Sequence, residues 1–161
     1  MSRLTYSEKE LFALIKQKRT NQFVQKFERS EYINKFCSNP MGDSLLGYAI
    51  ACNATIIAEY LAQDPELINY AGKNGKPPSH YFKNDVDEAF LVDLVGKGLD
   101  LNATDATNST VLHNMARMCS GKDFYTVVDG GADPYASNQI NEIPLDTAKR
   151  WNNRDILDYN L

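Results

Sequence analysis

The sequence has few of the residues on which most catalytic and metal-binding motifs depend. It contains three cysteines, two histidines and one tryptophan among 161 residues. Cys37, Cys52 and Cys119 lie far apart and form no C-x-x-C pair, which argues against a zinc site and against a disulfide framework. Phosphate-loop, dinucleotide-binding and H-E-x-x-H motifs are absent, and the carboxylates are scattered rather than paired. The sequence therefore gives no positive argument for catalysis, and we expect no cofactor and no metal.

Long apolar stretches are also missing. No run of 18 apolar residues is present, so we expect no membrane span and no membrane partner. The first 22 residues carry charges where a signal peptide requires an apolar stretch. These two observations predict a cytoplasmic protein.

The net charge of −4 conceals an uneven distribution. Residues 1–38 contain eight Lys/Arg and four Asp/Glu, whereas residues 39–161 contain nine and seventeen. Nucleic-acid binding requires many cations to neutralise phosphates, so the acidic part predicts no nucleic-acid partner. The basic part either contacts an acidic partner or is a solvated helix face.

The segment 107–138 shows how the rest of the chain is organised. A turn at Asn108–Ser109 precedes two short apolar helix patterns, which are separated by a polar break at 120–122. The second pattern ends at Gly130–Gly131, where glycine suits the left-handed conformation of a helix end. Two helices this short cannot bury their apolar faces alone, so they need similar neighbours.

Similar neighbours occur at a fixed interval along the chain. The recurring cores are Gly42–Ala49, Gly75–Phe82, Asn108–Ala116 and Asn141–Ala148. The unit's ending recurs as Gly98–Asn102 and Gly131–Tyr135. The pattern resembles the ankyrin repeat family, whose unit of about 33 residues has a T-P-L-H-x-A core, and segments 77–81, 110–113 and 143–146 match that core best. The resemblance implies an all-α fold, an ankyrin-repeat α-solenoid with short β-hairpin fingers.

The resemblance also divides the chain. Residues 1–38 are expected to form an N-terminal helical cap, a degenerate repeat, in front of an array at 39–161. The units of that array are about 40–72, 73–105, 106–138 and 139–161. In the cap, the first helix is expected over 7–18, with a capping box made by Ser7 and Glu10, and a second helix is expected to start at Asn21.

Two units carry more detailed expectations. The second unit departs most from the pattern, because Ser79 stands where the family has leucine, so its first helix is expected to be short or distorted. Such a departure is either drift or a site shaped for a ligand. In the last unit, Pro144, Leu145 and Ala148 are expected to form the core of the first helix.

The resemblance implies that a protein partner binds the fingers and the inner-helix ends on a concave surface. The positions that packing does not require are Tyr70, Lys73, Asn74, Lys76, Asn84, Asp85, Thr107, Arg117, Met118, Tyr135, Gln139, Ile140, Arg150 and Trp151. Trp and Arg are frequent in binding hot spots, which singles out Trp151 with Arg117 one unit earlier. The alternative for Trp151 is that it folds over the last helices as part of a cap.

The function predicted from these residues is non-catalytic binding of a protein by a monomer. Three uses stay open: an adaptor, an inhibitor of one enzyme such as an immunity-type protein, and a bacterial effector delivered to a host cytosol. The alternative from a different class is a small enzyme with a site around Cys119 or His80. In the ankyrin family, the histidine at the place of His80 and His113 usually braces the turn, so we expect a structural role for both.

Overall fold

The computed structural model describes residues 4–159, which fold into helices and loops. The predicted all-α class is confirmed for these residues: the only β-type pairing among them is an isolated antiparallel bridge between Ser38 and Ser44. The chain separates into two compact units, Met1–Pro78 and Ser79–Leu161. This boundary falls inside the second predicted repeat, and the division predicted at residue 38 stays a prediction.

The first compact unit consists of two helix pairs. Helices α1 (Tyr6–Lys16) and α2 (Thr20–Arg29) form one pair, and α3 (Leu45–Ala51) and α4 (Thr55–Leu61) form the other. Helix α1 packs against α3, and α2 packs against α4. The largest fully buried side chains between them are Leu11, Ile15, Phe23, Leu45, Leu46, Ile57 and Leu61.

The start of α1 corrects one prediction. Thr5, not Ser7, is the N-cap: its hydroxyl accepts the Glu8 N–H at 3.1 Å, and the Glu8 carboxylate accepts the Thr5 N–H at 2.8 Å. The other carboxylate oxygen of Glu8 accepts the Asn34 N–H at 3.1 Å, and Glu8 is buried. The predicted Ser7–Glu10 capping box is therefore wrong, because the long-range contact to Asn34 favours the earlier of two similar patterns.

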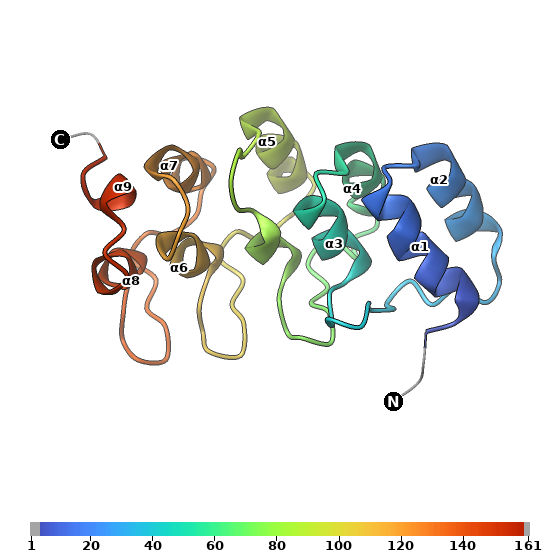
Figure 1. Cartoon of the computed structure of the whole chain (residues 1–161), viewed down its shortest axis with the longest axis horizontal. Coiled ribbons are helices and arrows are strands. Elements are labelled where there is room, and N and C mark those ends of the chain that lie inside the picture. The colour runs from blue at the N-terminus through green and yellow to red at the C-terminus, as the bar shows by residue number, and fades with distance from the viewer. Residues whose placement is uncertain (1–3, 160–161) are drawn as a thin grey trace. The chain divides into compact units, whose positions relative to one another are not determined.

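The second compact unit is built around two adjacent rows of short helices. Its elements are the 3₁₀ turn η1 (Pro78–Tyr81, which spans the unit boundary), α5 (Glu88–Gly96), α6 (Val111–Ala116), α7 (Gly121–Asp129), α8 (Pro144–Arg150) and α9 (Arg154–Leu157). Helix α6 lies beside α8, and α7 lies beside α5 and α9 (Figure 1). The core contains Leu91, Leu94, Leu112, Met115 and Phe124, all fully buried.

The helix starts recur at a constant interval. First elements begin at equal spacing along the chain, at Leu45, Pro78, Val111 and Pro144. Second helices begin at the same spacing, at Thr55, Glu88, Gly121 and Arg154. The expected weak first helix of the second unit is confirmed, because η1 is only a four-residue 3₁₀ turn.

The loops before the first elements share one turn. Its left-handed residue recurs with the same spacing, as Gly42, Gly75, Asn108 and Asn141. The N–H of each of these residues donates to the carbonyl three residues earlier. No paired strands accompany these turns within residues 4–159, so the predicted β-hairpins are not confirmed.

One predicted core residue is only partly buried. Pro144 and Ala148 are buried as expected, whereas Leu145 is half-buried. The main neighbours of α8 are α6 and α9, so part of its surface has no packed helix beside it in the described chain. The prediction of Leu145 as a core residue is therefore too strong.

Candidate interaction surface

The predicted binding residues fall in both compact units. Tyr70, Lys73, Asn74 and Lys76 belong to the first unit, and the other ten belong to the second. All of them except Tyr70 are exposed. Exposure alone does not define a site, so the contacts of each group decide which side chains the fold already uses.

In the first unit, two of the predicted residues brace loops. The Tyr70 hydroxyl donates to the Phe36 carbonyl at 3.1 Å, and the two rings lie 4.8 Å apart. The Asn74 amide donates to the Asp43 carboxylate at 2.9 Å. The Lys73 backbone N–H donates to Ser38 Oγ at 3.1 Å, and the Lys73 side chain is exposed. Tyr70 and Asn74 therefore have structural contacts that account for their presence.

In the second unit, two loops are closed by side-chain oxygens. Asp105 Oδ1 accepts the N–H groups of Thr107 at 2.8 Å and Ser109 at 3.2 Å. In the next loop, Asn138 Oδ1 accepts the N–H groups of Ile140 at 3.0 Å and Glu142 at 3.1 Å. Short polar side chains often close turns in this way. Sequence reasoning missed this role of Asp105 and Asn138, although each stands three residues before the left-handed residue of its turn.

The same loops contact each other and leave apolar side chains outside. The Gln139 N–H donates to the Thr107 carbonyl at 3.0 Å, which joins the two loops. Ile140 is 58% exposed and Tyr135 is 74% exposed. Thr107 and Gln139 thus hold the loops in position, whereas the side chains of Ile140 and Tyr135 are exposed.

Hydrogen bonding also sets the charge state of Asp105. Burial acts to raise the pKa of its carboxyl, but hydrogen bonds from Thr107 and Ser109 outweigh burial. The pKa of Asp105 is therefore lower than its ordinary value, and the loop is held by an ionised carboxylate at neutral pH.

Both histidines brace loops, as expected. His113 Nδ1 accepts the Thr110 N–H at 3.1 Å, and its Nε2 lies 2.9 Å from the Glu142 carbonyl. His80 Nε2 lies 2.9 Å from the Ala103 carbonyl, and its Nδ1 lies 3.0 Å from the Asn114 amide nitrogen. A carbonyl can only accept, so Nε2 carries the proton in both rings.

The turn after η1 contains the predicted residues Asn84 and Asp85. Both are exposed, and Asp85 has a φ of 55°. The turn is anchored by the next residue, because the Val86 N–H donates at 2.8 Å to Asp123, a buried carboxylate. Asp123 also accepts the Ser120 hydroxyl at 2.7 Å. Sequence reasoning missed Asp123, whose position three residues after Ser120 was the available signal.

The clearest grouping of predicted residues joins the ends of α6 and α8. Arg117 and Trp151 cap these two helices, and the guanidinium carbon of Arg117 lies 4.5 Å from the centroid of the Trp151 ring. Arg117 is exposed, and Trp151 is 47% exposed. Met118, the neighbour of Arg117, is 76% exposed. We call Arg117, Met118 and Trp151 the Arg117 cluster.

The backbone beneath the Arg117 cluster is held by one asparagine. The Asn153 amide donates to the carbonyls of Ala116 at 3.2 Å and Cys119 at 3.0 Å. The Ala116 carbonyl lies at the end of α6, where helix geometry leaves it without an intrahelical partner, and the Cys119 carbonyl lies in the turn that follows. Asn153 therefore ties the turn after α8 to the turn after α6. Sequence reasoning missed Asn153; its place before α9 suggests an ordinary helix cap, a bond that its side chain does not form.

Arg150 does not join the Arg117 cluster. Its guanidinium pairs with the Glu142 carboxylate at 2.9 Å, so the side chain runs back along α8. Helical side chains lean toward the N-terminus, which favours this direction. The structure thus places Arg117 and Trp151 together and directs Arg150 elsewhere.

The cysteines are poorly suited to nucleophilic chemistry. Cys119 is buried, and burial, with a smaller contribution from the Asp123 charge, raises the pKa of its thiol. The Lys83 charge opposes this shift. Burial also raises the pKa of Cys37 to about 12. A reactive cysteine needs the opposite shift.

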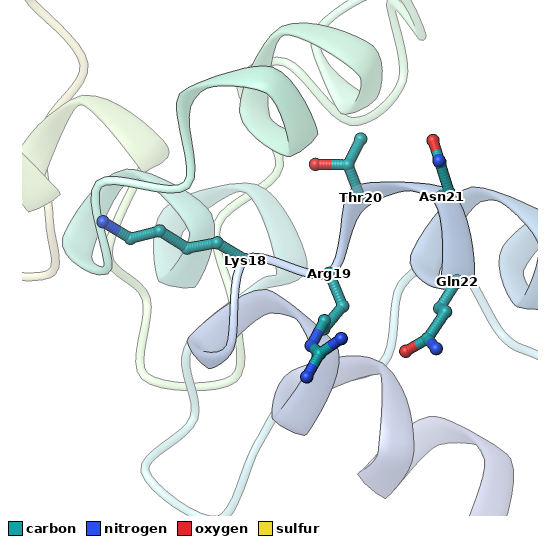
Figure 2. A pocket seen from close by; sticks show the side chains of 5 residues that line it. All are labelled: Lys18, Arg19, Thr20, Asn21 and Gln22. Carbon is teal, nitrogen blue, oxygen red and sulfur yellow. The ribbon is translucent and has the colours of Figure 1, made fainter.

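The basic N-terminal part contains an open hollow at the α1–α2 turn. The hollow has a volume of about 400 Å³ and is lined by Lys18, Arg19, Thr20, Asn21 and Gln22. Figure 2 shows these side chains spreading in different directions, with Lys18 extending to the left and Arg19 downward. A binding site needs converging polar groups, so this hollow is a weaker candidate than the Arg117 cluster.

Residues 4–159 contain no group of three or more His, Cys, Asp or Glu that could hold a metal ion. In the same part of the chain, no helix is long and apolar enough to cross a membrane. No protein-family model matches the sequence, and no curated protein matches it.

Proposed function

We propose that this chain is an ankyrin-type repeat solenoid that binds a protein partner without catalysing a reaction. Support comes from the regular recurrence of helix starts and of left-handed turn residues. Short helix pairs at a fixed spacing are typical of repeat proteins, in which variable surface positions select the partner. Fold alone does not define function, so the proposal depends on the surface of the second unit.

The Arg117 cluster is the observation that carries this proposal. It combines an arginine, a tryptophan and a methionine, residue types that are enriched at protein interfaces. Asn153 fixes the backbone beneath it, so the cluster is organised before a partner arrives. Ile140 and Tyr135 are further exposed apolar side chains of the same unit.

A capture experiment tests the proposal. The wild-type chain and the double variant Arg117→Glu, Trp151→Ala are immobilised and exposed to native lysate, and bound proteins are identified by mass spectrometry. Lys122→Glu is the matched control, because Lys122 is exposed on α7 of the same unit and changes charge in the same way. Circular dichroism checks that each variant folds.

We expect a protein that is retained by the wild type and by Lys122→Glu and is lost by the double variant. Its identity would distinguish an adaptor, an inhibitor of one enzyme and a bacterial effector. Retention of every bound protein by the folded double variant would contradict the proposed surface. The basic helices α1 and α2 would then be the next candidate for the binding surface.

The enzyme alternative predicts a different behaviour of Cys119. The structure gives this thiol a raised pKa, and the His80 ring nitrogens are engaged by Ala103 and Asn114. We expect iodoacetamide to label Cys119 in native protein far more slowly than in denatured protein, as peptide mass spectrometry would measure. Rapid native labelling at neutral pH would restore the enzyme hypothesis.

A further inference from the structure

The guanidinium of Arg117 lacks an acidic partner in the described part of the chain. No carboxylate of residues 4–159 lies within ion-pair distance of it. The carboxylates of α8 and the preceding loop are engaged by other cations: Glu142 by Arg150 at 2.9 Å, and Asp146 by Lys149 at 3.4 Å. Arg117 instead contacts the Trp151 ring.

An arginine in contact with an aromatic ring keeps its ability to bind an anion. A guanidinium carries several N–H donors, and one ring contact does not use all of them, so Arg117 can still donate to an anion. The ring limits the motion of the long side chain, which lowers the entropic cost of binding. The tie from Asn153 to Ala116 and Cys119 holds the two turns that carry the pair.

The surrounding charge selects which anion fits. Residues 79–161 contain seven Lys/Arg and thirteen Asp/Glu, a balance of −6. Such a unit repels nucleic acids and strongly acidic segments. In this acidic unit Arg117 offers one positive charge, which suits a single negative charge of a partner rather than several.

The apolar neighbours of Arg117 favour a partner that carries an apolar side chain beside its negative charge. Met118 is 76% exposed and Trp151 is 47% exposed, so apolar surface lies beside the cation. A flexible thioether adapts to apolar side chains of different shape. A partner segment that carries an acidic side chain next to an apolar one would satisfy both parts of the cluster.

We infer that the Arg117 cluster binds a peptide segment of the partner that has a single Asp or Glu beside an apolar residue. The carboxylate accepts hydrogen bonds from Arg117, and the apolar side chain packs on Trp151 and Met118. This inference rests on the proposed binding function and adds the chemistry of the ligand.

Selection from a phage-displayed library of random peptides tests the inference. The wild type, Arg117→Glu and the control Lys122→Glu are used as baits, after each is shown to fold. Peptides selected by the wild type should share one acidic residue adjacent to an apolar residue. Their affinity should fall about tenfold or more for Arg117→Glu, because a charge-assisted contact becomes a repulsion. Lys122→Glu should leave the affinity unchanged.

A reversal of charge sharpens the test. Selection on Arg117→Glu should enrich peptides with Lys or Arg at the position where the wild type selects Asp or Glu. Selected peptides that lack an acidic residue, or that bind Arg117→Glu as tightly as the wild type, would overturn the inference and leave the proposed function intact. Absence of any selected peptide would also overturn it. A different result would overturn the proposed function, namely capture of no protein from native lysate by the wild type.

Discussion

The elements η1 and α6 are consecutive in the series of equally spaced first elements, yet only α6 is an α-helix. Element η1 begins at Pro78 and α6 at Val111. Both contain a histidine at the third position, and both histidines bond through Nε2 to the carbonyl of a later loop. The bracing histidine is therefore retained where the helix is not.

The start of each element explains part of the difference. The Thr110 N–H donates to His113 Nδ1 at 3.1 Å, which satisfies a donor at the start of α6. The equivalent residue before η1 is Pro77, which has no N–H. His80 Nδ1 instead receives a hydrogen bond from the Asn114 side chain. A proline in place of threonine thus removes a local hydrogen bond, and a long-range one replaces it.

The buried side chains explain the rest. Leu112 on α6 is fully buried, and so is Ser79 at the equivalent place in η1. The Ser79 hydroxyl has no hydrogen-bond partner in the described structure. A buried hydroxyl without a hydrogen-bond partner destabilises the folded state, whereas a buried leucine side chain stabilises it. The comparison shows how one position can support a helix in one segment and weaken it in the next.

Removing the leucine should have the largest effect. Leu112→Ala is expected to lower the free energy of unfolding by about 2–5 kcal/mol, because it leaves a cavity in the core. Urea denaturation followed by circular dichroism measures this change. A loss below about 1 kcal/mol would show that Leu112 does not have the packing role assigned to it.

Alanine at the equivalent position in η1 should stabilise the fold, whereas alanine at position 112 should destabilise it. Ser79→Ala removes a buried hydroxyl that has no partner and leaves the backbone unchanged. We expect it to raise the free energy of unfolding by up to about 1 kcal/mol. The urea experiment that is used for Leu112→Ala applies here, and a clear destabilisation would indicate that the Ser79 hydroxyl is hydrogen-bonded in solution.

Substitution of Asp105 in the loop before α6 should have the smallest effect on stability, and this effect should depend most on pH. Asp105 closes this loop, whereas Gly72 stands at the equivalent place before η1 and offers no side chain. Because the pKa of Asp105 is lowered in the folded state, its stabilisation is complete above the ordinary carboxyl value. This stabilisation is lost as the pH falls through the lowered pKa that Asp105 has in the folded state.

The variant Asp105→Asn, whose amide does not titrate, tests whether stability falls at low pH because the Asp105 carboxylate is protonated. Asp105→Asn keeps an oxygen that can accept the same N–H groups, as Asn138 does in the next loop. Thermal unfolding between neutral and acidic pH should show a smaller loss of stability for Asp105→Asn than for the wild type. An identical pH dependence of the two proteins would contradict the role given to the carboxylate.

Much of the fold could be predicted because spacing determines it. The repeat period placed the helix pairs, and glycines and asparagines marked the turns. Capping was harder to predict: Thr5 and Ser7 both precede a glutamate by three residues, and only the contact of Glu8 with Asn34 distinguishes them. Local pattern cannot reveal such long-range partners.

The candidate site shows the same limit. The period places Arg117 one repeat before Arg150, and Trp151 follows Arg150, so a shared surface could be predicted. The choice of partners could not, because long side chains reach several neighbours. Arg150 pairs with Glu142, and Arg117 contacts Trp151. The role of Asn153 depends on carbonyls that become close only when α6 and α8 pack together.

Fluorescence of Trp151 gives the most direct test of the proposed surface, because this is the only tryptophan in the chain. A captured partner, or a selected peptide that lacks tryptophan, is titrated into the wild type and into Arg117→Glu while calorimetry measures binding. Burial of the half-exposed ring should shift its emission to shorter wavelength in the wild type, and Arg117→Glu should weaken both the shift and the heat of binding. Binding that leaves the emission of Trp151 unchanged would place the partner elsewhere and contradict the account.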